Sequence, residues 1–357
     1  MLLFERLLEI FLYMRSAHTL SYVGSKRCVT LFTGLARNPF CYHRVVTPIP
    51  VILDVDPGYD DALALMLACG APEMEVRAVT TVAGNVSLEK TTRNALRVLS
   101  LIGHVDVPVG AGAEAPLARP LHTAQHIHGE SGLDGPELPE PAFAPDGRGA
   151  VRLIADVVEA SAEPVTLIPV GPLTNVATFL EEYPRLKDNV SWIVLMGGSV
   201  GPGNTTPAAE FNIYVDPEAA SVVFGSGLPV KMVSLDVTRE AIAGPEEVRR
   251  VRSLGRVGEV AAELVTFCAG AYRGGYRHGG GLPIHDAVAV AAAVEPRILK
   301  DCSMRVEIEC QSELTRGETV CDVHGVWGKP PNVEVGLELD RMAFFEILYR
   351  SLGKLVA

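Results

Sequence analysis

The chain has 357 residues, of which 48% are hydrophobic, so it is not a disordered protein and can form one large domain or two ordinary ones. Its formal net charge of −12 argues against nonspecific nucleic-acid binding, which needs clustered lysine and arginine. Seven scattered cysteines without a C-x-x-C motif are typical of reduced core residues, and we therefore expect a cytoplasmic protein.

The first 48 residues are predicted to lie outside the fold. Residues 1–14 are apolar, but Glu5, Arg6 and Glu9 interrupt the run. A signal peptide instead places its positive charge first and a continuous apolar block after it. No uncharged apolar stretch of about 18 residues occurs in the chain, so a membrane-spanning helix is not expected. We expect residues 1–48 to be an extension and residues 49–357 to form a single domain.

From residue 49 onward, apolar β-branched runs alternate with helical patterns. This alternation predicts an α/β fold with a Rossmann-like core, in which helices cover both faces of a mostly parallel, doubly wound sheet. The predicted strands are Val51–Val55, Val76–Val82, Val107–Val109, Val165–Val170, Trp192–Met196, Val230–Ser234 and Met304–Ile308. The predicted helices are Ser87–Ile102, Asn175–Glu182, Pro217–Gly225 and His285–Val294. The proline-rich stretch Leu133–Pro145 is predicted to be a surface loop.

Four aspartates stand within eight residues at the end of the first predicted strand, at Asp54, Asp56, Asp60 and Asp61. An apolar run follows them, so the pattern predicts a strand, a tight turn and a helix. Carboxylates this close repel one another, and they stay ionised only if a positive charge lies among them. A hard divalent cation, which prefers oxygen ligands, is the best candidate. Open α/β sheets bind ligands at this end of their strands.

Other polar groups follow predicted strands or open predicted helices, where a parallel sheet would bring them to the same edge. They lie in the segments Thr80–Asn85, His126–Glu130, Val170–Asn175, Met196–Asn212 and His285–Asp286. Each group also has a purely structural interpretation. Helix capping would explain Asn85 and Asp286, and a complement to the helix dipole would explain Asp60 and Asp61. Solvation would explain His126, His128 and Glu210.

In combination, these motifs resemble the nucleoside hydrolases, specifically the inosine-uridine-preferring type of nucleoside N-ribohydrolase. The matching segments are Asp56–Ala62, Thr81–Asn85, His126–Glu130, Gly171–Asn175, Met196–Gly198, Ala209–Ile213, Asp216–Ala219, His285–Asp286, Glu313–Gly317 and Asn332–Val335. The resemblance spans Pro50 to Leu355, which makes residues 49–357 the catalytic domain. It implies hydrolysis of the N-glycosidic bond of ribonucleosides to free base and ribose, for nucleoside salvage. A homodimer or homotetramer is implied, with no nucleic-acid or membrane partner.

The resemblance also implies a Ca²⁺ site and a set of substrate contacts. The metal would be bound by the main-chain carbonyl of Val170 and by three carboxylates, those of Asp56, Asp61 and Asp286. The ribose hydroxyls would contact Asp60, Asn85, Asn204, Glu210 and Asn212, and Met196 would pack against the sugar. The base would lie near His128, His285 and either Tyr272 or Tyr276, which stand in a glycine-rich segment.

The chemistry of the reaction assigns roles to two of these residues. N-glycosidic cleavage passes through an oxocarbenium-like sugar, so a water must be activated and the base must be allowed to leave. Asp56, touching both metal and water, is the best general base. His285 is expected to be a proton donor to the leaving base or its hydrogen-bond partner, with a pKa that a neighbouring acid can move toward neutral pH. The preferred base stays open.

Two other functions are considered. In a haloacid-dehalogenase-like phosphatase, Asp54 would be the nucleophile and Asp56 the acid and base, with Mg²⁺. Pro57 and the Asp60-Asp61 pair do not fit that motif. A noncatalytic nucleoside-binding relative would be favoured by the loss of a ligand aspartate, and none is missing.

Overall fold

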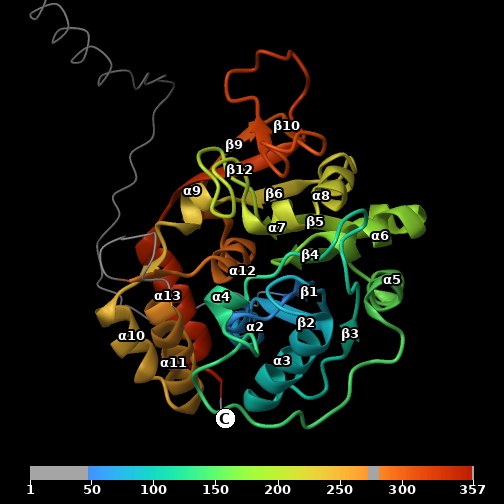
Figure 1. The fold of residues 1–357 in the computed structure, drawn as a ribbon. Coiled ribbons are helices and arrows are strands. Elements are labelled where there is room, and N and C mark those ends of the chain that lie inside the picture. Colours follow the sequence, from blue (N-terminus) through green and yellow to red (C-terminus); the bar gives the residue numbers. More distant parts are fainter. Residues whose placement is uncertain (1–46, 272–280, 356–357) are drawn as a thin grey trace, which may run out of the picture. The chain divides into compact units, whose positions relative to one another are not determined.

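The computed structural model describes residues 47–271 and 281–355, which belong to a unit spanning Val46–Ala357. The centre of this unit is an eight-stranded sheet (Figure 1). In spatial order its strands are β3 (Val109–Ala111), β2 (Met74–Thr81), β1 (Ile49–Val55), β4 (Val165–Pro169), β5 (Val190–Met196), β6 (Val230–Val233), β12 (Val333–Leu339) and β9 (Leu299–Met304). All neighbours pair in parallel except β12 and β9, which confirms the predicted α/β class.

The strand order reverses direction beside β1. The chain moves from β1 through β2 to β3 on one side, and from β4 through β5 to β6 on the other. The carboxyl ends of β1 and β4 therefore border the topological switch point, where doubly wound sheets open a crevice for ligands. The two ends are held together there, because the amide of Val170 donates to the carbonyl of Asp54 at 2.8 Å.

Helices cover both faces of the sheet, and each face has its own hydrophobic core. One core contains α2 (Tyr59–Gly70), α3 (Leu88–Leu101), α11 (Arg256–Ala271), α12 (Asp286–Val294) and α13 (Arg341–Leu352). The other contains α5 (Ala150–Ala160), α6 (Thr174–Glu182) and α8 (Pro217–Phe224). Residues along β1 alternate between them, with Val51 and Leu53 in the first core and Ile52 in the second. No helix within the described residues is long and apolar enough to cross a bilayer.

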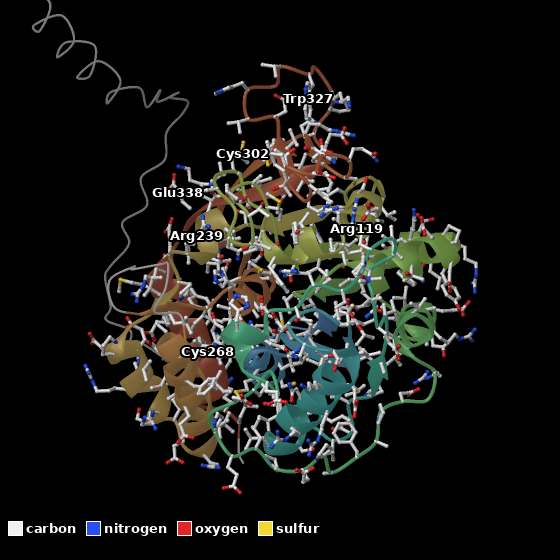
Figure 2. The ribbon with its side chains drawn as sticks, in the orientation of Figure 1. Arg119, Arg239, Cys268, Cys302, Trp327 and Glu338 are labelled. Atoms are coloured by element: carbon white, nitrogen blue, oxygen red, sulfur yellow. The ribbon has the colours of Figure 1, made fainter. Side chains whose placement is uncertain are left out.

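Shorter elements complete the described residues. They are α4 (Gln125–His128), η1 (Pro184–Asn189), α7 (Phe211–Val215), α9 (Leu235–Thr238), β7 (Ile242–Ala243), α10 (Pro245–Arg252), β8 (Leu282–Pro283), η2 (Pro296–Ile298), β10 (Val306–Ile308) and β11 (Thr319–Cys321). The β10–β11 hairpin lies beyond β9, and the loop after β11 carries Trp327 (Figure 2). Asp322 orders this loop, because its two carboxylate oxygens accept the amides of Val326 and Trp327, each at 2.8 Å.

The predicted helices are confirmed, with boundaries shifted by at most one residue. The helix predicted from Pro217 begins there as α8, and the carboxylate of Asp216 caps it by accepting the amide of Ala219 at 3.0 Å. The helix predicted from His285 begins one residue later as α12. The loop predicted at Leu133–Pro145 contains no helix or strand.

Several segments differ from the prediction, and three of them bear on the sheet or the site. The predicted strand Met304–Ile308 is wrong, because β9 ends at Met304 and β10 begins at Val306 in a separate hairpin. The Asn332 side chain bonds both the amide and the carbonyl of Val306, which takes those groups away from the main sheet. β12 is absent from the prediction, because its alternating polar residues conceal a strand that lies inside the sheet between β6 and β9. Residues 126–128, expected in a loop, belong to the short helix α4.

Candidate active site

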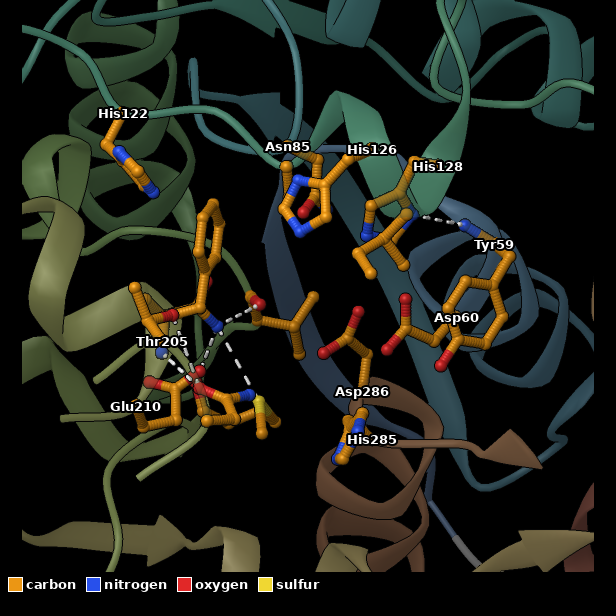
Figure 3. Close-up of a pocket in the computed structure, with 17 residues that line it drawn as sticks. Tyr59, Asp60, Asn85, His122, His126, His128, Thr205, Glu210, His285 and Asp286 are labelled. Atoms are coloured by element: carbon orange, nitrogen blue, oxygen red, sulfur yellow. Dashed lines mark hydrogen bonds between the residues drawn. The ribbon is translucent and has the colours of Figure 1, made fainter. Parts of the chain in front are cut away.

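A single pocket beside the switch point gathers most of the residues that the sequence singled out (Figure 3). The predicted residues that line it are Asp60, Asn85, His128, Val170, Met196, Asn204, Glu210, Asn212, His285 and Asp286. Asp56 and Asp61 lie directly behind this lining, next to Asn85. Tyr272 and Tyr276 lie outside the described residues, so the prediction that one of them covers the base stays a prediction.

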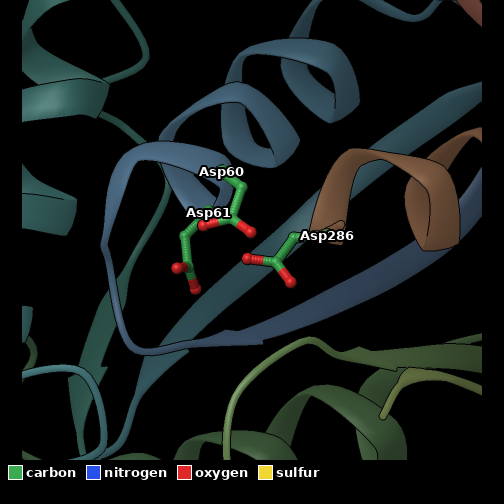
Figure 4. A group of neighbouring side chains, drawn as sticks. All are labelled: Asp60, Asp61 and Asp286. Carbon is green, nitrogen blue, oxygen red and sulfur yellow. The ribbon is translucent and has the colours of Figure 1, made fainter. Parts of the chain in front are cut away.

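Three aspartates from two distant parts of the chain point toward one another beside this pocket (Figure 4). Asp60 and Asp61 lie in the first turn of α2, and Asp286 is the first residue of α12. One carboxylate oxygen of each lies within 4.8 Å of the other two, an arrangement that could hold a metal ion. α2 and α12 pack against each other in the same core, which fixes the distance between the acids.

Asp61 is oriented by the turn that precedes α2. Its carboxylate accepts the amides of Asp56 and Gly58, each at 3.0 Å, and the side-chain amide of Asn85 at 3.3 Å. The carboxylate thereby satisfies two main-chain amides that would otherwise lack partners, including that of the N-cap residue Gly58. Asp61 thus connects the end of β1, the turn before α2 and the loop after β2. These hydrogen bonds fix the orientation of its carboxylate before any ligand binds.

Asp56 occupies a narrow slot between two glycines. One carboxylate oxygen, Oδ2, accepts the amide of Asn85 at 2.7 Å, while Oδ1 is buried and has no hydrogen-bond partner among the described residues. A Cβ added at Gly84 would lie 2.1 Å from Oδ2, and one at Gly171 would lie 2.5 Å from Oδ1. The glycines of two separate sequence motifs therefore make room for the same carboxylate.

Burial raises the pKa of all four acids, Asp56, Asp60, Asp61 and Asp286, and for three of them neighbouring carboxylates raise it further. Burial, followed by the charge of Asp61, raises the pKa of both Asp56 and Asp60 well above the usual range. Burial and the charges of Asp60 and Asp61 do the same to the pKa of Asp286. No lysine or arginine among the described residues forms an ion pair with any of them. Buried carboxylates need a compensating positive charge, and a set of oxygen donors suits a hard divalent cation.

Asp54 belongs to the sheet rather than to the pocket. Its Oδ1 accepts the hydroxyl of Thr80 at 2.6 Å and the side-chain amide of Asn175 at 2.8 Å. Burial raises its pKa to about 6. Because Asp54 does not line the pocket, it cannot attack a bound substrate, and the phosphatase interpretation loses its nucleophile.

The two predicted base-side histidines are held by neighbouring groups. Nδ1 of His285 lies 2.7 Å from Oγ1 of Thr238. Nδ1 of His128 accepts the amide of Tyr59 at 3.4 Å, and the two rings stack at 5.4 Å. Burial lowers the pKa of His285 to about 4, with the charge of Arg239 contributing, and burial lowers that of His128 to about 3. The expected upward shift for His285 is therefore wrong, and both rings are neutral at neutral pH.

The opposite end of the pocket is built from α7 and the loop before it. Oε2 of Glu210 caps α7 by accepting the amide of Ile213 at 3.1 Å, and it also accepts the amide of Gly198. The side-chain amide of Asn212 donates to the carbonyls of Val170 at 2.7 Å and Met196 at 3.1 Å. These bonds link the ends of β4 and β5 to α7, and they orient the Val170 carbonyl that the resemblance assigns to the metal.

Several pocket residues were not identified from the sequence. They include Tyr59, His122, Thr205 and Phe211. Tyr59 and Phe211 stand inside motifs whose polar members carry the prediction, and their large aromatic side chains are the signal in the sequence that points to them. His122 stands in no motif, and only the fold brings it to the pocket edge, where its ring lies 6.3 Å from that of Phe211.

Comparison with known proteins identifies the family. The model of the inosine-uridine preferring nucleoside hydrolase family matches residues 51–346. A pyrimidine-specific ribonucleoside hydrolase, RihA, from Escherichia coli is 47% identical over 301 residues, covering 84% of this chain and 97% of the relative.

Solved structures agree with this assignment. A purine-preferring ribonucleoside hydrolase from Gardnerella vaginalis has a TM-score of 0.81 and 34% identity, covering 86% of this chain and 98% of its own. An inosine-guanosine nucleoside hydrolase has a TM-score of 0.79 and 30% identity, covering 87% of this chain and 100% of its own. The chain belongs to the inosine-uridine preferring nucleoside hydrolase family and is a hydrolase that acts on N-glycosyl compounds.

Proposed function

We propose that this enzyme hydrolyses the N-glycosidic bond of ribonucleosides in a Ca²⁺-dependent reaction that releases free base and ribose. The observation that carries the proposal is the group of four buried carboxylates at the switch point, which has no basic partner among the described residues. A site of this kind is unfavourable without a cation, and the pocket beside it is lined by groups suited to ribose hydroxyls.

The carboxylates of Asp56, Asp61 and Asp286 and the carbonyl of Val170 would hold the metal. When bound, Ca²⁺ would fix the ribose 2′- and 3′-hydroxyls and lower the pKa of a water. The orphaned Oδ1 of Asp56 supports this arrangement, because it is a buried acceptor that no donor among the described residues satisfies. Asp60 lies beside Asp61 and Asp286 and also lines the pocket, so its carboxylate is suited to contact a substrate bound next to the metal.

The protein's own groups would carry the rest of the reaction. Asp56 accepts the proton of the attacking water, and the oxygen of that water forms the new bond to C1′ of ribose. The bond between C1′ and the base breaks, and its electron pair goes to the base. The surrounding carboxylates stabilise the positive charge that develops on the sugar. Asn85, Asn204, Glu210 and Asn212 orient the ribose, and His285 hydrogen-bonds the departing base.

We further propose a preference for pyrimidine ribonucleosides. The supporting observation is that the pyrimidine-specific relative is 47% identical to this chain over nearly its whole length, whereas the purine-preferring hydrolase is 34% identical. The base end of the described pocket contains His128, His285 and Tyr59, which provide hydrogen-bonding and stacking groups for a planar base.

A single assay tests both proposals. We expect ribose to be released from uridine and cytidine faster than from inosine or adenosine when Ca²⁺ is present, with activity lost in excess chelator and restored by added Ca²⁺. Absence of ribose from all four nucleosides, with a folded enzyme, would refute hydrolysis. Faster turnover of inosine would refute only the base preference, and activity that survives chelation would refute the metal requirement.

We also propose that residues 1–48 are not needed for catalysis. The family match begins at residue 51, and β1 begins at Ile49. A chain starting at residue 47 should retain the kcat and melting temperature of the full chain, because the strand that opens the sheet is intact. A large loss of either quantity would show that the extension contributes to the folded enzyme.

A further inference from the structure

The end of the short helix α9 contacts two parts of the pocket through the consecutive residues Thr238 and Arg239. Thr238, its last residue, is fully buried and bonds Nδ1 of His285 at 2.7 Å. Arg239, which is labelled in Figure 2, follows Thr238. It donates to the carbonyls of Pro202 and Gly203, at 2.9 and 2.7 Å, and these residues directly precede Asn204 of the pocket. The contact between Thr238 and His285 determines which nitrogen of the imidazole ring carries the hydrogen.

Hydrogen-bond accounting decides which group donates in this contact. A threonine hydroxyl carries one hydrogen, and a buried hydroxyl hydrogen without an acceptor costs roughly 1–3 kcal/mol. Within the described residues, Nδ1 of His285 is the acceptor that lies in reach of the Thr238 hydroxyl. If Nδ1 carried the ring proton, Thr238 would have to accept it and leave its own hydrogen unpaired. The favoured arrangement has Thr238 donating to an unprotonated Nδ1.

The tautomer of His285 follows from this donation. A neutral imidazole with an unprotonated Nδ1 carries its hydrogen on Nε2. The ring lines the pocket, and among the described residues Nδ1 is the ring nitrogen that has a protein partner. Nε2–H is thus available to a ligand in the pocket.

We propose that Thr238 is a positioning residue that fixes His285 as the Nε2–H tautomer, so that His285 serves as a neutral hydrogen-bond donor to the departing base. This inference rests on the proposed ribonucleoside hydrolysis. As the glycosidic electron pair moves onto the base, an acceptor such as the pyrimidine O2 gains negative charge and its bond to Nε2–H strengthens. The base then leaves hydrogen-bonded and takes its proton from solvent, while the His285 ring keeps its own.

The first test observes the tautomer without any turnover. In ¹⁵N-histidine-labelled enzyme, we expect Nδ1 of His285 to show the signal of an unprotonated ring nitrogen, assigned by its disappearance in His285→Gln. In Thr238→Val, the hydroxyl donor is gone, and the signal should move toward a mixture of the two tautomers. A protonated Nδ1 in the wild-type enzyme, or an unchanged signal in Thr238→Val, would overturn the proposal.

The second test separates positioning from simple structural support. Thr238→Val should lower kcat on uridine roughly 3- to 10-fold, because only the molecules that keep the Nε2–H tautomer and the ring orientation can donate to the base, with little change in KM. Turnover of 4-nitrophenyl riboside, whose leaving group needs no such bond, should stay within about twofold of wild type. Thr238→Ser keeps the hydroxyl and should restore the uridine rate.

A matched control is Thr91→Val. Thr91 is also fully buried, and its hydroxyl donates to the Leu88 carbonyl of its own helix, α3, away from the pocket. It should change neither the His285 signal nor the ratio of the two rates. Equal losses on uridine and 4-nitrophenyl riboside in Thr238→Val would refute the positioning role. If the wild-type enzyme hydrolysed no nucleoside, the proposed function would fail, while the tautomer would still be decided by the ¹⁵N signals.

Discussion

Asp56→Asn is expected to reduce kcat for ribose release by about a thousandfold or more, a larger effect than any other single side-chain change in the pocket. The substitution keeps the size of the side chain within the slot between Gly84 and Gly171. It removes the negative charge that would bind the metal and the basic oxygen that would accept the water proton. The measurement is ribose released from a saturating nucleoside at fixed Ca²⁺, with folding checked by circular dichroism.

Asp322→Asn provides the control for Asp56→Asn. Asp322 is also a buried aspartate whose carboxylate accepts main-chain amides, but it lies in the loop after β11 and not in the pocket. The Asp322→Asn enzyme should keep a kcat close to that of the wild type even if its melting temperature falls. If Asp56→Asn retained a tenth or more of wild-type kcat, the assignment of Asp56 as general base and metal ligand would be wrong.

The second large effect is expected on stability. Removing Ca²⁺ with a chelator should lower the melting temperature by about 8 °C or more, since saturation at about a thousand times Kd contributes about 4 kcal/mol to the free energy of unfolding. The melting temperature of Asp286→Asn should hardly change with the chelator, because this variant lacks one of the proposed carboxylate ligands of the metal. The variant should also melt above the wild type in chelator, because one of four mutually repelling buried charges has been removed.

The same site predicts how the calcium effect depends on pH. Burial raises the folded-state pKa of Asp56, Asp60 and Asp286 well above the usual range, that of Glu210 in the pocket to about 7, and that of Asp54 in the adjoining sheet to about 6. A raised carboxyl pKa contributes stability that is fully present below the unfolded value near 4, and that is lost as pH rises through the folded value. The chelated enzyme should therefore lose stability as pH rises through about 6 to 7.

Differential scanning calorimetry between about pH 5 and pH 8 measures this dependence. The gap between the calcium-loaded and chelated melting temperatures should widen toward pH 8, where the carboxylates are ionised and bind the cation. A gap that stayed constant or narrowed over this range would contradict a calcium site built from these acids. Asp322→Asn should show the wild-type pH dependence, because its carboxyl lies outside the group.

Local sequence patterns predict those helices whose starts are set by residues close to them in the chain. The aspartate run after an apolar strand placed Asp60 and Asp61 in the first turn of a helix, and Asp216-Pro217 marked the start of α8. Both follow from capping and periodicity, which act over a few residues. β12 could not be found this way, because its place between β6 and β9 depends on partners far away in the chain.

The motifs alone indicate the family, the α/β class and the residue types of the site, because they are local and their order along the chain is specific. Which groups touch depends on the folded chain: Asp286 faces Asp61 across two packed helices, glycines from two loops enclose Asp56, and Thr238 holds His285. The folded chain also decides that the His285 pKa falls rather than rises. Burial and long-range packing set these properties, and neither is encoded in a residue's immediate neighbours.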